Sequence, residues 1–216
     1  LSKVILDYAH TPDALKTCLL NLREQFPHKK ITLLFGCGGN RDQNKRSKMG
    51  KIASNYADNI ILTNDNPRFE NPEKIRRDIK KGIKKKRIIE ISNRAIAISE
   101  AIKNLNTGNI LLVAGKGHEK TQDIKDKKIY FSDRKVILNS IKVKNKNLSN
   151  NLKINMIKEV SQISKLPSSI SIKNVKINSR EVCKNDIFFA IKGKKNDGNK
   201  FVAQSFKRKA SLAIVN

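Results

Sequence analysis

The sequence predicts an α/β protein: a mostly parallel sheet with helices on both faces, followed by a small second α/β domain. Apolar runs of strand length alternate with helical stripes four or five times across residues 1–141, which is typical of a doubly wound, Rossmann-like sheet. Most of these runs end in a polar or glycine-bearing turn, where open α/β sheets bind ligands. A polar stretch at 142–153, interpreted as a linker, precedes a shorter pattern at 154–216.

The first strand and helix are predicted at the start of the chain. Residues 4–6 form a short apolar run, and Thr11 followed by Pro12 is a typical helix start. The helix ends before Pro27 and carries an apolar stripe at helical spacing, so the cysteine within it is interpreted as a core residue. The stripe consists of Leu15, Cys18, Leu19, Leu22 and Phe26.

The other elements of the first domain repeat this arrangement. The run at 109–114 is almost purely apolar, which predicts a central parallel strand. Asn71 and Pro72 predict a second helix start of the same kind as the first. The predicted strands are 31–35, 60–62, 88–91 and 109–114. The predicted helices are 49–56, 72–87, 93–105 and 132–141, with a hairpin around 126–127.

The second domain is predicted from a shorter set of patterns. It holds too little apolar material for more than a small domain. We expect a helix at 156–163, strands at 175–177, 186–191 and 212–215, and a helix at 201–209.

The net charge of +27 suggests a nucleic-acid partner, but the composition weakens that interpretation. The excess is nearly all Lys, spread along the chain and accompanied by many Asn and Ile, which share A/T-rich codons. Aromatic residues make up only 5%, and the basic runs lack the stacking residues that single-strand binders use. We therefore expect no nucleic-acid partner, and a basic nucleic-acid-binding module remains an alternative that a gel shift across salt concentrations tests.

Cysteine usage and hydropathy point to the cytoplasm. The three cysteines form no C-x-x-C pair, so neither a zinc site nor a disulfide framework is predicted, and no metal ligand is assigned. No apolar run approaches the length of a membrane span, and no signal segment opens the chain. We expect a cytoplasmic protein without a membrane partner.

A candidate ligand site lies at 65–68, directly after a predicted strand. An Arg can hold a carboxylate with two parallel hydrogen bonds, and an Asp can hold an ammonium, so Asp65 and Arg68 suit an amino-acid substrate. Taken alone, these residues favour a simple surface ion pair that caps a turn.

Three other loops support the site, because the carboxyl ends of parallel strands share one edge of a sheet. They carry Asp7 and His10, the glycines of 36–42, and the turn at 115–119. The glycines allow close backbone approach, and Cys37 among them is not expected to be a nucleophile. No G-x-x-x-x-G-K-[ST] phosphate loop occurs in the chain.

Together these four motifs resemble those of the Mur ligases in order and spacing. The resemblance covers residues 1 to about 140 and is to the C-terminal domain of the members that add diaminopimelate. The motifs are DYAHTP (7–12), GCGGNRD (36–42), DNPR (65–68) and AGKGHE (114–119).

The resemblance implies an ATP-dependent amide-forming ligase of peptidoglycan synthesis. Such an enzyme phosphorylates a carboxylate of a UDP-N-acetylmuramoyl peptide, and the amine of meso-diaminopimelate attacks the acyl phosphate; ATP and Mg²⁺ are held mainly by a central domain. Nucleotide contacts are implied for Asp7 and His10. A lysine-adding ligase of the same family remains an alternative. Diaminopimelate contacts are implied for Arg41, Asp65, Asn66, Pro67, Arg68, Gly115 and Glu119.

The second domain resembles a different Mur ligase domain, the N-terminal, UDP-substrate-binding domain of the D-alanyl-D-alanine-adding enzyme. The resemblance rests on NSR (178–180), DIFFAIKG (186–193) and DG (197–198). It implies UDP-substrate contacts for Ser179 and Arg180. It also implies a fusion of two ligases of which this chain is the junction, inactive as a catalyst by itself.

Overall fold

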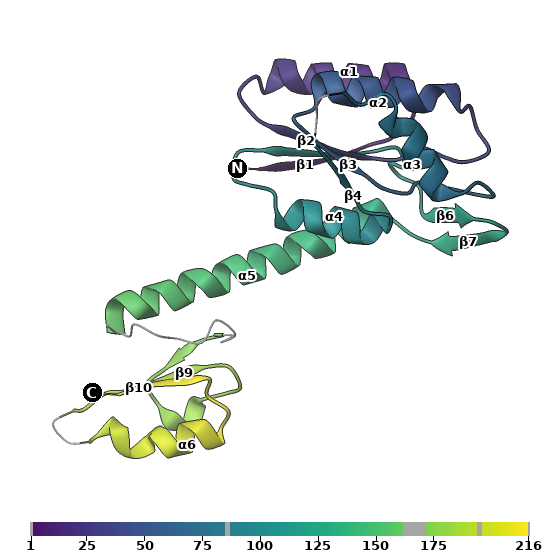
Figure 1. Ribbon diagram of the computed structural model, residues 1–216. Coiled ribbons are helices and arrows are strands. Elements are labelled where there is room, and N and C mark those ends of the chain that lie inside the picture. The colour runs from purple at the N-terminus through teal and green to yellow at the C-terminus, as the bar shows by residue number, and fades with distance from the viewer. Residues whose placement is uncertain (1, 85–86, 162–171, 194–195, 216) are drawn as a thin grey trace. The chain divides into compact units, whose positions relative to one another are not determined.

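The computed structural model describes residues 2–84, 87–161, 172–193 and 196–215, with side chains described outside 149–161 (Figure 1). Contacts divide the chain into two units, Leu1–Lys144 and Asn145–Asn216. Each unit is an α/β arrangement of its own, as predicted.

The first unit is built on a five-stranded sheet with the order β1-β5-β2-β3-β4, and every pair of neighbours in it is parallel. β5 is the last of these strands in the chain, yet it pairs with both β1 and β2 and is buried throughout, which confirms the central position predicted for it. The strands are β1 (Lys3–Asp7), β2 (Ile31–Phe35), β3 (Asn59–Leu62), β4 (Ile88–Glu90) and β5 (Ile110–Ala114).

Helices cover both faces of this sheet (Figure 1). One face packs on α1 (Pro12–Gln25), α2 (Asn44–Tyr56) and α3 (Pro72–Lys80), with Leu19, Met49 and Ile79 buried against the strands. The other face packs on α4 (Arg94–Lys103) and the first turns of α5 (Asp133–Ser161). Two separate apolar clusters result, one on each face of the sheet. Successive residues of a strand point to opposite faces, so neighbouring apolar residues of one strand belong to different clusters.

The helix starts follow the capping chemistry that the sequence predicts. The Thr11 hydroxyl accepts from the Ala14 amide, and the Asn71 side chain accepts from the amides of Glu73 and Lys74. Proline at the first helical position follows both caps, where its missing N–H costs nothing. These caps fix where each chain segment leaves its loop and enters its helix.

The helix predicted to end near Ile141 is longer than expected, since α5 continues to Ser161 through the predicted linker at 142–153. That stretch is polar but contains neither Pro nor Gly, so nothing in it stops a helix. Lys144 also donates to the carbonyls of Ile102 and Leu105 at the end of α4, where a cation complements the helix dipole. The separate helix predicted at 156–163 is therefore the end of α5, and residues 162–163 lie outside the described residues.

A short antiparallel hairpin follows β5 in the first unit, made of β6 (Thr121–Ile124) and β7 (Lys127–Tyr130). It was predicted around Asp126, and Lys125 has the positive φ of 53° that its tight turn requires. The hairpin matters for the site because it lies against the loop after β3.

The second unit holds a three-stranded parallel sheet with the order β10-β9-β8. Its core includes Ile172, Ile187 and Phe188. Asp186 is fully buried and accepts from the amides of Asn174 and Cys183, which ties the start of β9 to its neighbours. Its elements are β8 (Val175–Lys176), η1 (Ser179–Glu181), β9 (Ile187–Ala190), η2 (Gly198–Phe201), α6 (Val202–Lys207) and β10 (Leu212–Val215).

Among the helices of the described residues, none is long and apolar enough to cross a lipid bilayer.

Candidate functional site

The carboxyl ends of β1, β2, β3 and β5 meet at one edge of the first unit, and their loops surround a cleft of about 500 Å³. This convergence confirms the central prediction from the sequence: Arg68 and Glu119 line the same cleft. Its lining is mainly polar and charged. The residues are Tyr8, His10, Thr11, Pro12, Gly36, Cys37, Gly38, Arg41, Asp42, Lys45, Lys48, Asp65, Asn66, Arg68, Gly115 and Glu119.

Asp65 and Asn66 form the floor of the cleft and are both buried. One oxygen of the Asp65 carboxylate accepts from the Asn66 amide at 2.7 Å. The other faces Gly115, where a Cβ would lie only 2.9 Å from it, so this glycine leaves the space in which the carboxylate sits. A carboxylate oxygen at the bottom of a polar cleft can hold an ammonium group.

Glu119 reaches the same floor from the loop after β5. Its Oε2 accepts from Asn66 at 3.0 Å and from the Lys116 ammonium at 2.7 Å. Burial of Glu119 raises its pKa, but the hydrogen bonds from Lys116 and Asn66 and the charges of Lys116 and Arg68 outweigh burial, so the pKa lies below its usual value. The Glu119 carboxylate is therefore ionised at neutral pH.

Arg68 stands in a strained backbone conformation at φ 50°, a region that residues other than Gly seldom adopt. Its guanidinium donates to the Gly39 carbonyl at 2.8 Å and lies 3.9 Å from the Asp123 carboxylate. These contacts hold the side chain, which is about a quarter exposed, against the wall of the cleft. A held guanidinium with donors left over is suited to bind a carboxylate.

The β6–β7 hairpin supports the loop that carries Arg68. Arg68 pairs with Ile124 as an isolated β-bridge, its amide donating to the Asp123 carbonyl and its carbonyl accepting from the Lys125 amide. Gln122 donates to the carbonyl of Asp65 at 2.5 Å. The hairpin thus supplies backbone hydrogen-bond partners that stabilise the strained conformation of Arg68.

The glycine-rich loop lies against the same segment. Gly39 donates to the Asn66 carbonyl at 2.8 Å, and a Cβ at Gly39 would lie 2.0 Å from the Pro67 carbonyl oxygen. A Cβ at Gly38 would lie 2.9 Å from the Arg68 guanidinium and 3.8 Å from the Cγ atom of Arg41. These glycines therefore leave room for the Arg68 guanidinium to lie against the glycine-rich loop.

Comparison with known proteins assigns the first unit. Residues 2–117, more than half of the chain, match the family described as Mur ligase, glutamate ligase domain. The chain belongs to the Mur ligase family. Residues 171–214 match a second description, Mur ligase family, catalytic domain.

Several relatives similar to this Mur ligase chain carry the same name, UDP-N-acetylmuramoyl-L-alanyl-D-glutamate--2,6-diaminopimelate ligase. The relative from Rickettsia typhi is 50% identical over 137 residues, which are 63% of this chain and 28% of the relative. The relative from Buchnera aphidicola is 52% identical over 143 residues, 66% of this chain and 29% of the relative. A solved structure of an enzyme with this name matches at a TM-score of 0.63 and 39% identity, covering 66% of this chain and 30% of that one.

The chain thus spans less than a third of the length of the curated relatives it matches. The match at 171–214 is again to a Mur ligase domain, and it does not specify which ligase. The assignment of the second unit to a D-alanyl-D-alanine-adding ligase therefore stays a prediction.

Of the two residues predicted to contact the nucleotide, only His10 lines the cleft of this Mur ligase. His10 lines the cleft and is exposed, its Nδ1 2.9 Å from the Tyr8 carbonyl. Its ring lies 4.6 Å from that of Tyr8, which in turn lies 5.3 Å from His118. Asp7 is not among the lining residues; its carboxylate accepts from the Ala9 amide and so caps the turn that presents His10.

Magnesium has no built site among the described residues. No group of three or more His, Cys, Asp or Glu side chains gathers there in a way that could hold a metal ion. The carboxylates of the cleft are instead paired with Asn66, Lys116 and backbone amides. The described residues therefore do not fit a magnesium site.

The remaining predicted residues divide between the two units. Pro67 does not line the cleft, although its carbonyl packs against Gly39. In the second unit, Ser179 is buried and donates to the Gln204 side chain at 2.8 Å, while Arg180 is exposed.

Sequence reasoning missed Lys116, Gln122 and Asp123, which hold the predicted residues in place. Lys116 stands inside the AGKGHE motif, and its spacing to Glu119 at i+3 was the one available signal. The contributions of Gln122 and Asp123 have no local sequence signature, because their partners lie 57 residues away or are backbone groups.

Proposed function

We propose that residues 1–141 form the amino-acid-binding domain of an ATP-dependent ligase that adds meso-diaminopimelate to UDP-N-acetylmuramoyl-L-alanyl-D-glutamate in peptidoglycan synthesis. Membership of the Mur ligase family and the shared name of the relatives support this proposal. The observation that carries it is the presence of Arg68, Arg41 and two ionisable acids, Asp65 and Glu119, around one cleft.

The chemistry of diaminopimelate matches this set of charges. Each end of the molecule bears an ammonium and a carboxylate, whereas lysine lacks the carboxylate at its far end. Arg68 and Arg41 bind that carboxylate, and Asp65 and Glu119 bind the ammonium beside it. Lysine would leave Arg68 without its partner, which costs roughly 2–5 kcal/mol and separates the two amino acids.

The contribution of this domain is to bind and orient the attacking amine. With one end of diaminopimelate held at the floor of the cleft, the other amine points toward the mouth. ATP supplies the activation of the acceptor carboxylate, and the described residues provide no phosphate loop or metal cluster for it. His10 and Tyr8 also line the cleft, and we assign the nucleotide contact to them.

Arg68→Ala tests the proposed specificity. Calorimetry on the chain is expected to give saturable binding of meso-diaminopimelate that the substitution removes, with lysine binding weakly to both proteins. Arg77→Ala is the matched control, because Arg77 lies on the exposed surface of α3, with two-thirds of its side chain accessible. Equal affinity of the unsubstituted chain for lysine and diaminopimelate would instead favour a lysine-adding ligase.

Kinetics on a protein extended to the length of the relatives separate binding from nucleotide use. Arg68→Ala should raise the KM for diaminopimelate far more than the KM for ATP. Equal loss for the two substrates would contradict a role for Arg68 in amino-acid binding.

For the second unit we propose the start of a UDP-substrate-binding domain of a D-alanyl-D-alanine-adding ligase. The Mur ligase match over 171–214 supports a domain of this family, and Arg180 is an exposed cation available to a phosphate. Ser179 would act through the turn it stabilises, since its hydroxyl is engaged by Gln204. Loss of UDP-N-acetylmuramoyl peptide binding in Arg180→Ala, measured on the extended protein, is the expected result.

A further inference from the structure

Lys116 is a fully buried lysine in the loop after β5. A buried ammonium is unfavourable unless it is paired and hydrogen-bonded. Its Nζ donates to the Asn66 side-chain oxygen at 2.7 Å and to Glu119 Oε2 at 2.7 Å. Both acceptors belong to residues that line the cleft, while Lys116 itself does not.

The contacts of Lys116 close a ring of three side chains. Asn66 accepts from Lys116 through Oδ1 and donates to Glu119 through Nδ2 at 3.0 Å. The same Asn66 oxygen accepts from the Asp123 amide at 3.1 Å. The ring therefore joins three separate segments: the loop after β3, the loop after β5 and the hairpin.

We propose that Lys116 is the positioning residue of the amino-acid site, its buried ammonium holding Asn66 and Glu119 in the orientation that binds the ammonium end of the substrate. The inference rests on the proposed function for the identity of the ligand. The positioning itself rests on the geometry alone. Because Glu119 uses only Oε2 for Lys116 and Asn66, Oε1 remains for the ligand.

The charges around Glu119 make the role measurable. Lys116 lies on its own loop, Arg68 faces it from the loop after β3, and Arg94 faces it from the start of α4. Two further carboxylates lie in the same region: Asp65 beside Gly115, and Asp123 beside Arg68. Without the Lys116 charge, burial and these acids raise the pKa of Glu119, and only Arg68 and Arg94 still lower it. Glu119 should therefore take up a proton more readily.

The test compares Lys116→Met with Lys120→Met, a neighbouring lysine on the same loop whose side chain is exposed. The carbon resonance of the Glu119 carboxyl is followed by NMR across pH on the chain as it is. In Lys116→Met, Glu119 is expected to protonate at a higher pH, by about one pH unit or more. Lys120→Met should titrate like the unsubstituted protein.

Calorimetry with meso-diaminopimelate supplies the second readout. Lys116→Met should weaken binding about tenfold or more at pH 7, about 1.4 kcal/mol. The affinity of the variant should fall further as the pH drops toward 5.5, whereas the unsubstituted protein, with the pKa of Glu119 held low, should change little. A purely structural lysine would not alter this pH profile.

Unchanged Glu119 titration and unchanged affinity in Lys116→Met would overturn the inference. If Lys116→Met does not fold, Lys116→Met/Glu119→Gln is compared with Glu119→Gln alone. Positioning through Glu119 predicts that the double variant loses little more affinity than the single one, and a full additional loss refutes it. If the unsubstituted chain binds no diaminopimelate while Glu119 still shifts in Lys116→Met, the proposed function fails and the positioning role stands.

Discussion

At the scale of single residues, buried charges decide how the loops of the cleft are held. Arg94 and Asp133 are both fully buried, with hydrogen bonds of 2.8 and 2.7 Å between them. Arg94 also donates to the Ala114 carbonyl at 3.0 Å, the last residue of β5. This pair joins the starts of α4 and α5 to the strand that delivers the 115–119 loop.

Breaking that pair should be strongly destabilising. Arg94→Met leaves the Asp133 carboxylate buried without its partner, which costs about 3–5 kcal/mol. Urea denaturation of the chain measures this loss. Arg77→Met, which removes an exposed pair with Glu73, should cost about 0.5 kcal/mol or less. A loss of under about 1 kcal/mol for Arg94→Met would show that the buried pair contributes little.

The cysteines should differ sharply in reactivity. Burial, with a smaller contribution from the Asp65 charge, raises the pKa of Cys37 to about 12. Burial and the nearby Asp7 carboxylate raise the pKa of Cys18 to about 11. At pH 8 only about one Cys37 thiol in 10,000 is a thiolate. We expect a disulfide reagent to modify exposed Cys183 rapidly and the other two slowly, as mass spectrometry of the labelled peptides would show.

Fast labelling of Cys37 in the folded protein would contradict the burial of this residue. The same result would reopen a nucleophilic role for Cys37, which both the sequence and its position against the Met49 sulfur argue against.

At the scale of elements, the cleft depends on loops that touch one another more than on the strands beneath them. The glycine-rich loop donates to the loop after β3, and the hairpin pairs with the other side of that loop. The loop carrying Asp65 and Arg68 is thus enclosed between two neighbours. Its strained residue, Arg68, is held by both of them.

Gly39→Ala should disturb this packing. The added Cβ would lie 2.0 Å from the Pro67 carbonyl oxygen, so one of the two loops must move. We expect a loss of about 1–3 kcal/mol in stability and weaker binding of diaminopimelate, because Arg68 loses its contact with the Gly39 carbonyl. Thermal unfolding and calorimetry report the two effects.

Gly193→Ala in the second unit is the matched control, since its Cβ would meet its nearest neighbour, the Asn196 carbonyl, at 3.4 Å. It should leave stability within about 0.5 kcal/mol and leave binding unchanged. A tolerated Gly39→Ala would mean that the two loops separate without cost.

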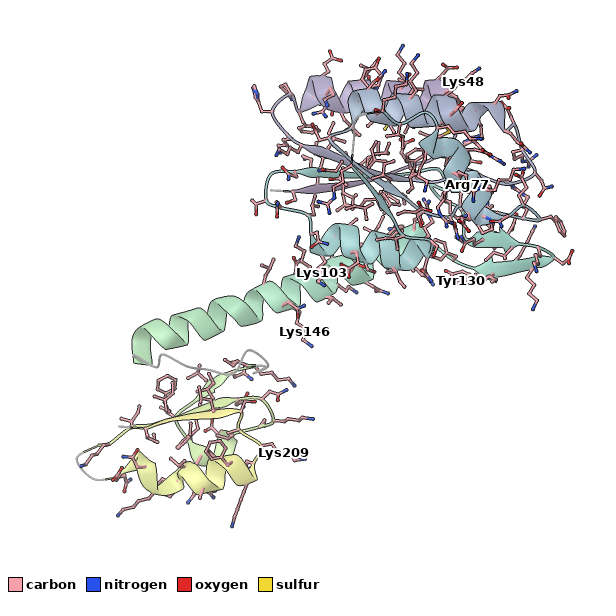
Figure 2. All side chains as sticks on the ribbon, viewed as in Figure 1. Lys48, Arg77, Lys103, Tyr130, Lys146 and Lys209 are labelled. Atoms are coloured by element: carbon pink, nitrogen blue, oxygen red, sulfur yellow. The ribbon has the colours of Figure 1, made fainter. Side chains whose placement is uncertain are left out.

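At the scale of the whole molecule, the dominant property is its charge of +27. The labelled lysines Lys48, Lys103, Lys146 and Lys209 come from α2, α4, α5 and the segment after α6 (Figure 2). Charge spread over so many elements gives general attraction to polyanions without a shaped binding surface.

We therefore expect weak, salt-sensitive association with nucleic acid. In a gel-shift titration, complexes with DNA of arbitrary sequence should form at low ionic strength and disappear by roughly 0.2 M salt. A complex that persists tightly above that concentration would support the alternative of a basic nucleic-acid-binding module. Diaminopimelate binding, measured at the same salt concentrations, should change far less because its partners lie in a partly buried cleft.

The sequence by itself determined the alternation of strands and helices, the capped helix starts and the four loops at the edge of the sheet. These features are local: apolar spacing, Pro after a capping residue, and glycine in a turn act within a few residues. The residues predicted at 41, 65, 66, 68, 115 and 119 line one cleft because parallel strands place their carboxyl ends together.

Only the tertiary structure decided the rest. The position of β5 between β1 and β2, the support of Arg68 by the hairpin and the burial of Lys116 against Asn66 all join groups that are far apart in the chain. The contact of Lys144 with the end of α4 likewise joins residues 42 positions apart in the chain. From sequence, a lysine or a polar stretch is predicted to be exposed to solvent. Only the partners that folding brings to it can make burial or a helix the more stable state.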